Sequence, residues 1–270
     1  MDFKDILVHV DNSKQCASRL DLAINIARQH KAYLTGLYVV THQHYKPQSG
    51  ADSVEATEAE ELFRRKTSGA DICAEWLSVD WGVAGVGMVE VLNYHAHQKG
   101  LVIVGQTDPE VRDGDVPPDL PERVVMGSGR PVLIVPYAGT FDKIGERVIV
   151  AWKAGRASAR AVNDAMPFLV KAKQVCVLSI KTVGDHQDVV TRPDGDICTH
   201  LKRYDIEIRE ENLVTGDIPV ADILMNYAWE NGCDLIVSGA YAHTSRGTPN
   251  LGLVAKHLLE KMTLPVLMSD

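Results

Sequence analysis

Two histidine pairs and a cluster of glycines are the residues whose types and spacing come nearest to known chemistry. His42 and His44, like His95 and His97, are separated by one residue and could chelate a metal ion. The first pair lies in a polar stretch that we interpret as a loop. The second falls on a predicted helix, where residues i and i+2 face different directions. We therefore expect no metal site.

The glycine cluster does not form a recognised nucleotide motif. Gly82, Gly85 and Gly87 read G-x-x-G-x-G, which is not the order of a dinucleotide-binding fingerprint, and we interpret them as a turn. The sequence also lacks a G-x-x-x-x-G-K-[S/T] phosphate loop, a G-x-S-x-G nucleophile elbow and an H-E-x-x-H metal motif. Because no motif places a nucleophile beside a base, we expect no catalytic residues and no enzymatic activity.

Composition and charge exclude several classes of partner. The net charge of -8 disfavours nucleic acid and anionic membranes, both of which require a basic surface. No apolar run is long enough to span a membrane, and the first residues lead into a strand-like run rather than a signal peptide, so we expect the cytoplasm. The five cysteines are scattered and never in a C-x-x-C spacing, which predicts neither a disulfide framework nor a zinc site.

An internal repeat supplies the elements that must position any site. An apolar run at residues 6–10 is followed by a helical pattern, with Ser13 as the expected N-cap. The same pattern returns 142 residues later at residues 148–152, which places Asp11 opposite Lys153. Each helix leads into a second apolar run, and this strand-helix-strand order implies a parallel sheet.

The two copies agree again at their ends. Residues 101–105 match residues 235–239, and residues 131–135 match residues 265–268, both at an offset of 134. The first copy therefore carries extra residues, which we assign to the polar stretch 43–68 and interpret as including a solvated helix.

The repeat predicts an α/β protein of two tandem domains, residues 1–140 and 141–270. Each domain should contain five mostly parallel strands with helices on both faces. In such sheets ligands bind beyond the carboxyl ends of the strands, where the strand order reverses.

This organisation resembles that of the universal stress proteins, which carry a nucleotide motif G-x2-G-x9-G-[S/T] from the fourth strand into the last helix. In the second copy the frame begins at Gly239, has Ala242 in place of the second glycine, and ends at Gly252 and Leu253. The resemblance covers the whole chain twice and implies two universal-stress-protein-like domains. It also implies a pseudo-two-fold axis between them, with the last strands pairing.

The first copy departs from the motif at most of its positions. Gly105 is kept, but Asp108 replaces the second glycine and Pro118-Asp119 replaces the final Gly-[S/T]. Glycines and a helix N-terminus bring backbone N–H groups close to a phosphate. Asp108 adds a negative charge, Pro118 removes an N–H donor, and Asp119 replaces a hydroxyl with an anion while being a good N-cap. We therefore predict that the first domain does not bind nucleotide.

The second copy keeps part of the motif. Ala242 adds only a methyl group and Leu253 removes a hydroxyl, but Lys153 stands where the family has an acidic residue near the adenosine. Arg246 could hold phosphate oxygens through two N–H groups, although a solvated loop is the simpler interpretation. The candidate nucleotide-binding residues are Ala151, Trp152, Gly239, Ala242, Arg246, Gly252 and Leu253.

These residues lead to one main functional expectation and two alternatives. The main one is a non-enzymatic stress-response protein whose first domain does not bind nucleotide. The first alternative is a sensor or signalling module that binds ATP, as an adenine nucleotide ligand, in the second domain. The second is a pocket reassigned to another small ligand. The expected partners are an unknown protein and a second copy of the chain.

Overall fold

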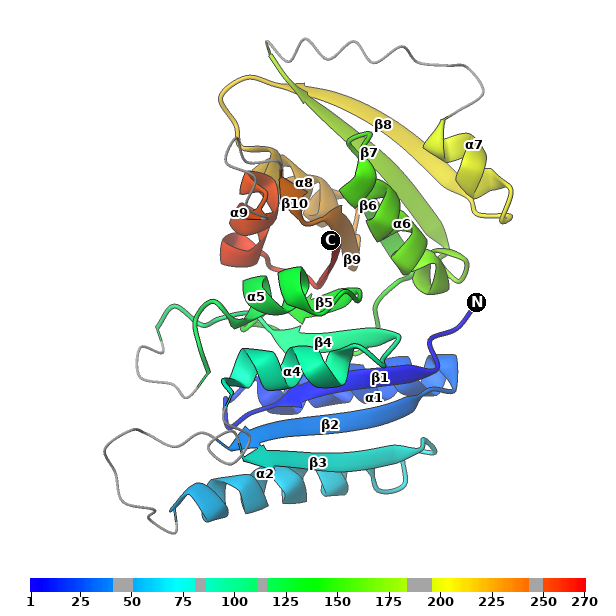
Figure 1. Cartoon of the computed structure of the whole chain (residues 1–270). Helices are drawn as coiled ribbons and strands as arrows, with labels where there is room; N and C mark the ends of the chain where they lie inside the picture. Colours follow the sequence, from blue (N-terminus) through cyan, green and yellow to red (C-terminus); the bar gives the residue numbers. More distant parts are fainter. Residues whose placement is uncertain (41–50, 81–85, 111–115, 184–195, 243–249) are drawn as a thin grey trace. The chain divides into compact units, whose positions relative to one another are not determined.

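The chain forms two compact units in the computed structural model (Figure 1), which we describe separately. The N-terminal unit contains Asp2–Lys143, and the C-terminal unit contains Ile144–Asp270 together with Met1. The structure describes residues 1–40, 51–80, 86–110, 116–183, 196–242 and 250–270.

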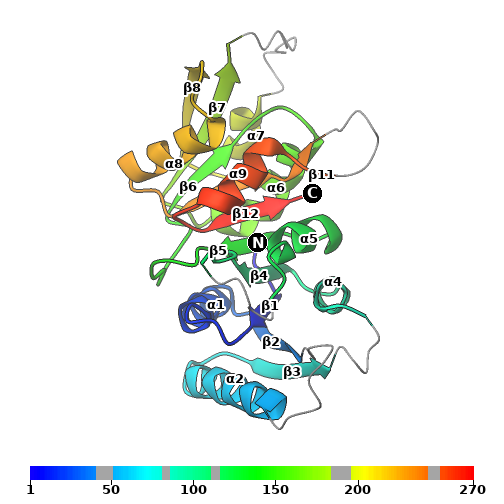
Figure 2. The ribbon, with the colours of Figure 1, turned by 90° about the vertical axis from the view of Figure 1, so that its left-hand side faces the viewer.

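The N-terminal unit is a parallel sheet of five strands in the order β3-β2-β1-β4-β5. Figure 2 shows α1 and α2 on one side of this sheet and α4 and α5 on the other. Its elements are β1 (Asp5–Val10), α1 (Cys16–His30), β2 (Tyr33–Val40), α2 (Ala51–Thr67), β3 (Ala74–Asp80), α4 (Met88–Ala96), β4 (Leu101–Gly105), α5 (Leu120–Gly127) and β5 (Val132–Val135).

The C-terminal unit repeats this plan, with its parallel strands in the order β12-β9-β6-β7-β8. Its main elements are β6 (Arg147–Ala151), α6 (Arg156–Leu169), β7 (Gln174–Thr182), α7 (Ile197–Lys202), β8 (Ile208–Thr215), α8 (Val220–Glu230), β9 (Leu235–Gly239), α9 (Leu253–Lys261) and β12 (Val266–Ser269). A short antiparallel ribbon, β10 (Tyr241–Ala242) with β11 (Asn250–Leu251), joins β9 to α9. The predicted tandem α/β fold is confirmed.

The central strands are apolar at successive positions because helices cover both faces of each sheet. Ile6, Leu7 and Val8 of β1 are all completely buried, as are Val148 and Ile149 of β6. Successive side chains of a strand point to opposite faces, so each sheet buries two apolar layers.

The helix predicted in the polar stretch of the first copy exists as α2, but it is more than a solvated helix. Phe63 is 2% exposed and packs directly on β2, where a Cβ atom at Gly36 would lie 2.6 Å from the Phe63 ring. Phe63 also contacts the Trp76 ring on β3. Because Gly36 has no side chain, it leaves room for the Phe63 ring, which packs α2 against the sheet.

One local capping prediction is wrong, and a second is correct in position only. Ser13 is not an N-cap: α1 begins at Cys16 after Gln15, and the Ser13 N–H instead donates to the Asp11 carboxylate at 2.9 Å. Asp119 does occupy the N-cap position of α5, but its side chain makes no capping hydrogen bond.

Some predicted features lie outside the described residues. These are His42, His44, Gly82 and Gly85, whereas Gly87 directly precedes α4. Among the described helices, none combines the length and the apolar character that crossing a membrane requires.

Candidate ligand site

A pocket of about 560 Å³ lies in the N-terminal unit, at the carboxyl ends of its parallel strands. Asp11 follows β1, Val39 lies near the end of β2, Gly105 ends β4, and Pro136 follows β5. This is the edge at which parallel α/β sheets bind ligands. The pocket belongs to the copy whose glycine motif is more degraded.

The floor of this pocket holds a buried ion pair. Arg19 reaches from α1 to Asp11, with its Nη2 2.6 Å from Asp11 Oδ2, and its Nε donates to the His9 carbonyl at 3.0 Å. The side chains of Arg19 and Asp11 are 3% and 13% exposed. Two groups of the guanidinium are therefore already engaged by the protein itself.

The pair determines the charge state of its neighbours. Burial alone would raise the pKa of Asp11, but the Arg19 charge, His9 and hydrogen bonds from Ser13 outweigh it and hold this pKa well below its usual range. Burial lowers the pKa of His9 to about 4, with Asp11 opposing the shift and Arg19 adding to it. His9 is therefore neutral near pH 7, while Asp11 and Arg19 are both charged.

The same contact explains why Gly105 is kept in the first copy. A Cβ atom at this position would meet Arg19 Nη1, far inside a normal contact distance. Glycine thus leaves room for a guanidinium that bridges α1 and β1. The surviving glycine can be explained by packing, without a phosphate.

The residues after β4 build the rim of the pocket. Asp108 and Glu110 line it, and the Asp108 carboxylate accepts the Glu110 N–H at 2.9 Å. Thr107 donates its hydroxyl to the Pro118 carbonyl at 2.7 Å, which ties this rim to the segment before α5. Asp108, recognised in the sequence as a departure from the motif, thus faces the pocket.

The candidate residues of the second domain lie at the equivalent edge of the C-terminal sheet. Ala151 at the end of β6 pairs with Ser238 of β9, so Ala151 and Gly239 end neighbouring strands. The Trp152 N–H donates to the Leu178 carbonyl at 2.9 Å, continuing the ladder toward β7.

The β10-β11 ribbon brings the two halves of the motif together. Ala242 pairs with Asn250, and the Gly252 N–H donates to the Ala240 carbonyl at 2.8 Å. Leu253 begins α9 directly after Gly252 and is 87% exposed. Arg246 lies outside the described residues.

Gly239 is packed against the start of α6. A Cβ atom at Gly239 would lie 2.7 Å from the Ala157 carbonyl carbon and 2.8 Å from the Ser158 nitrogen. These are backbone atoms, so they cannot move aside as the end of a side chain can. At this motif position too, the glycine allows a helix to approach a strand closely.

We expect Gly239→Ala to destabilise the C-terminal unit by about 1–3 kcal/mol, because the added methyl group overpacks a backbone contact. Native-state hydrogen exchange of the β9 amides measures this. Gly216→Ala is the matched control, since no heavy atom lies within 4 Å of its added Cβ. Equal stability of the two variants would contradict the packing role of Gly239.

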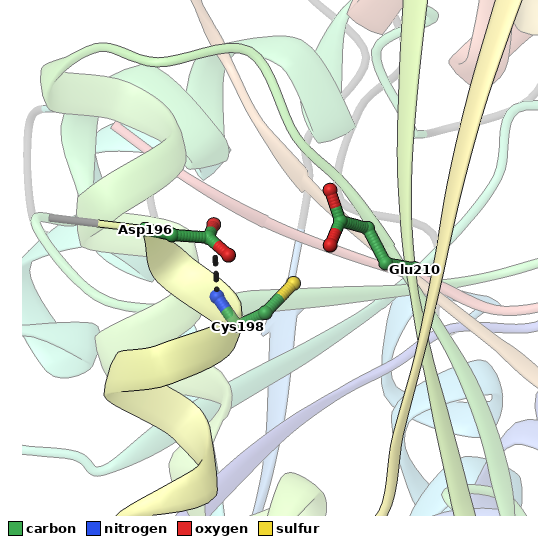
Figure 3. Close-up of side chains that lie close together, drawn as sticks. All are labelled: Asp196, Cys198 and Glu210. Atoms are coloured by element: carbon green, nitrogen blue, oxygen red, sulfur yellow. Dashed lines mark hydrogen bonds between the residues drawn. The ribbon is translucent and has the colours of Figure 1, made fainter. Parts of the chain in front are cut away.

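A separate cluster in the C-terminal unit contains three groups of metal-ligand type. Ligand atoms of Asp196, Cys198 and Glu210 lie within 4.8 Å of one another. Figure 3 shows the Cys198 sulfur turned toward Glu210, while the Asp196 carboxylate accepts the Cys198 N–H at 3.2 Å. Burial, together with both carboxylates, raises the pKa of Cys198 to about 12, and Asp196 is the N-cap of α7.

Sequence reasoning did not single out Arg19 or His9. A signal for Arg19 was present, because it shares the apolar stripe of α1 with Cys16, Leu20 and Ala23. A cation on a buried stripe requires a buried partner.

Comparisons with known proteins agree with this fold. A model of the universal stress protein family matches residues 2–136, half of the chain. A universal stress protein from Archaeoglobus fulgidus superposes with a TM-score of 0.68 over 98% of this chain and 96% of that one, at 16% identity. A Pseudomonas aeruginosa structure described as a universal stress protein gives a TM-score of 0.62 over 99% of this chain and 93% of that one, also at 16% identity.

A search of the curated proteins gives no match. The two structural likenesses, at 16% identity, show the fold. The family model, which spans half of the chain, identifies the relationship: this chain belongs to the universal stress protein family.

Proposed function

We propose that this chain is a non-enzymatic stress-response protein whose N-terminal domain does not bind nucleoside triphosphates. The main support for this proposal is the position of the Arg19 guanidinium. It fills the space beside Gly105 and is hydrogen-bonded to Asp11. In this proposal the chain acts in the cytoplasm, through a protein partner or a second copy of itself.

The charges around the pocket support this proposal. Asp108 and Glu110 line the region where the glycine motif would admit phosphates. A carboxylate about 4 Å from a phosphate charge costs on the order of 1 kcal/mol in water and more at lower effective dielectric. Arg19 cannot offset this repulsion freely, because its charge is already paired with Asp11.

The state of the titratable groups supports the absence of catalysis. Burial raises the pKa of the Cys16 thiol, so this buried cysteine is a poor nucleophile. His9 is buried and neutral, and its Nε2 lies out of contact with solvent. Cys16 does not line the pocket, and His9, which does, is a weak base because its pKa is so low.

ATP binding by the C-terminal domain is the second candidate. The exposed N-terminus of the nine-residue helix α9 favours it, although Leu253 at its first position lacks the hydroxyl of the motif. The tight backbone contact at Gly239 weighs against it, since no space is left on that side of the glycine.

Isothermal titration of nucleotide-free, full-length protein with ATP and magnesium tests the proposal. We expect either no binding or binding that Ala242→Asp abolishes, because the new carboxylate would repel a phosphate at the second-domain motif. ATP binding of unchanged affinity in Ala242→Asp would place the nucleotide in the N-terminal domain and contradict the proposal.

A further inference from the structure

The pocket of the N-terminal unit is large enough for a small organic molecule. Its volume of about 560 Å³ falls within the range typical of ligand pockets, roughly 300–1,000 Å³. Apolar side chains from three strands and the segments beside them form much of its wall: Val10, Val39, Met88, Val135 and Pro136. These surfaces suit the apolar body of a ligand.

Among the lining residues that the structure describes, none presents an unpaired cation at the floor of the pocket. The Arg19 side chain is 3% exposed, ion-paired to Asp11 and hydrogen-bonded to the His9 carbonyl. His9 adds no positive charge near pH 7, because burial keeps its ring neutral. An anionic ligand group would have to displace Asp11 from Arg19 to gain a partner there.

The remaining charges make the pocket slightly acidic. Among the lining residues that the structure describes, three carboxylates (Asp11, Asp108 and Glu110) face two cations (Lys14 and Arg19). Arg19 and Asp11 neutralise each other at the floor. The charges that remain are the carboxylates of Asp108 and Glu110 and the ammonium group of Lys14. The field of the rim therefore opposes anions and tolerates neutral or positively charged groups.

We propose that this pocket binds uncharged or cationic organic molecules with an apolar body, because its rim carboxylates repel anions and its Arg19 cation is already paired with Asp11. This inference rests on the proposed function, which closes the same pocket to nucleoside triphosphates. It adds a class of ligand that the pocket accepts.

Three probes of one shape and different charge test the proposal: 2-naphthamidine as a cation, 2-naphthamide as a neutral molecule and 2-naphthoate as an anion. Titration into the full-length protein is followed by NMR through the amide signals of Gly105, Gln106 and Thr107. We expect the cation and the neutral probe to bind at least about tenfold more tightly than the anion. Equal or tighter binding of naphthoate, or no saturable shift with any probe, would overturn the inference.

Matched variants test the origin of the selectivity. Asp108→Asn with Glu110→Gln should bring the affinity for naphthoate closer to that for naphthamide, and the asparagine retains the oxygen that accepts the Glu110 N–H. Glu58→Gln with Glu61→Gln, at exposed positions of α2, is the control and should leave the ratio unchanged.

Arg19→Met provides a second, independent readout. Removal of this cation leaves Asp11 unpaired at the floor, so the preference for naphthamidine over naphthamide should increase about tenfold. Arg19→Lys, which keeps a cation near Asp11, should stay near the wild-type ratio. An unchanged ratio in Arg19→Met would assign Arg19 a purely structural role. Failure of this inference is distinguishable from failure of the proposed function, because a pocket that excludes ATP could still bind all three naphthyl probes equally.

Discussion

Replacing Arg19 with methionine should lower the stability of the N-terminal unit by about 3–5 kcal/mol. Methionine keeps much of the length and apolar volume of the side chain, but it leaves the Asp11 carboxylate buried without its partner. It also removes the donor to the His9 carbonyl. Native-state hydrogen exchange of the β1 amides reports the stability of this unit alone.

An exposed ion pair provides the control for this substitution. Arg123 and Glu90 make a contact of 2.7 Å, but their side chains are 44% and 50% exposed, so Arg123→Met should change stability by less than about 1 kcal/mol. Adding Asp11→Asn to Arg19→Met should restore part of the loss by removing the unpaired charge. If Arg19→Met lowers the stability of the N-terminal unit no more than Arg123→Met does, the buried ion pair does not stabilise this unit.

Acid should destabilise the N-terminal unit through His9. The pKa of His9 is lowered from 6.5 to about 4 on folding. Between these two pH values the unfolded chain binds a proton at His9 and the folded chain does not. The contribution of a neutral His9 is therefore complete above pH 6.5 and is lost as the pH falls toward 4. A shift of this size corresponds to about 3 kcal/mol.

Comparison with His9→Asn isolates this contribution from the carboxylates that titrate over the same range. Asparagine stays neutral, so the variant should lose less stability than the wild type between pH 7 and pH 4.5. His97→Asn, at an exposed position after α4, is the control and should follow the wild-type curve. Identical pH dependence of the wild type and His9→Asn would contradict the neutral, buried state of His9.

The fold was accessible from the sequence because buried parallel strands leave a strong pattern. The apolar runs at residues 6–10 and 148–152 became β1 and β6, with ends within one residue of the prediction. Local capping was less accessible. Ser13 has the right residue type for an N-cap. Its N–H instead donates a hydrogen bond to the Asp11 carboxylate, and α1 begins only at Cys16.

The site was only partly accessible, because its decisive contacts join positions whose proximity depends on packing. Asp11 and Asp108 were noted in the sequence, and both line the pocket. Arg19 lies eight residues from Asp11 and far in sequence from Gly105, yet it contacts the first and fills the space beside the second. Family spacing identified Gly105 and Gly239 as motif positions, but what packs against each glycine depends on the folded structure.

An NMR titration of the full-length protein with ATP and magnesium, observed at the amides of Gly105, Gln106 and Thr107, tests directly whether a triphosphate enters the N-terminal pocket. We expect no saturable shift of these signals at millimolar ATP, because Arg19 and Asp11 are paired with each other and the rim is acidic. A saturable shift at these three amides would show that a triphosphate enters the pocket, and it would contradict the proposal that the N-terminal domain does not bind nucleoside triphosphates.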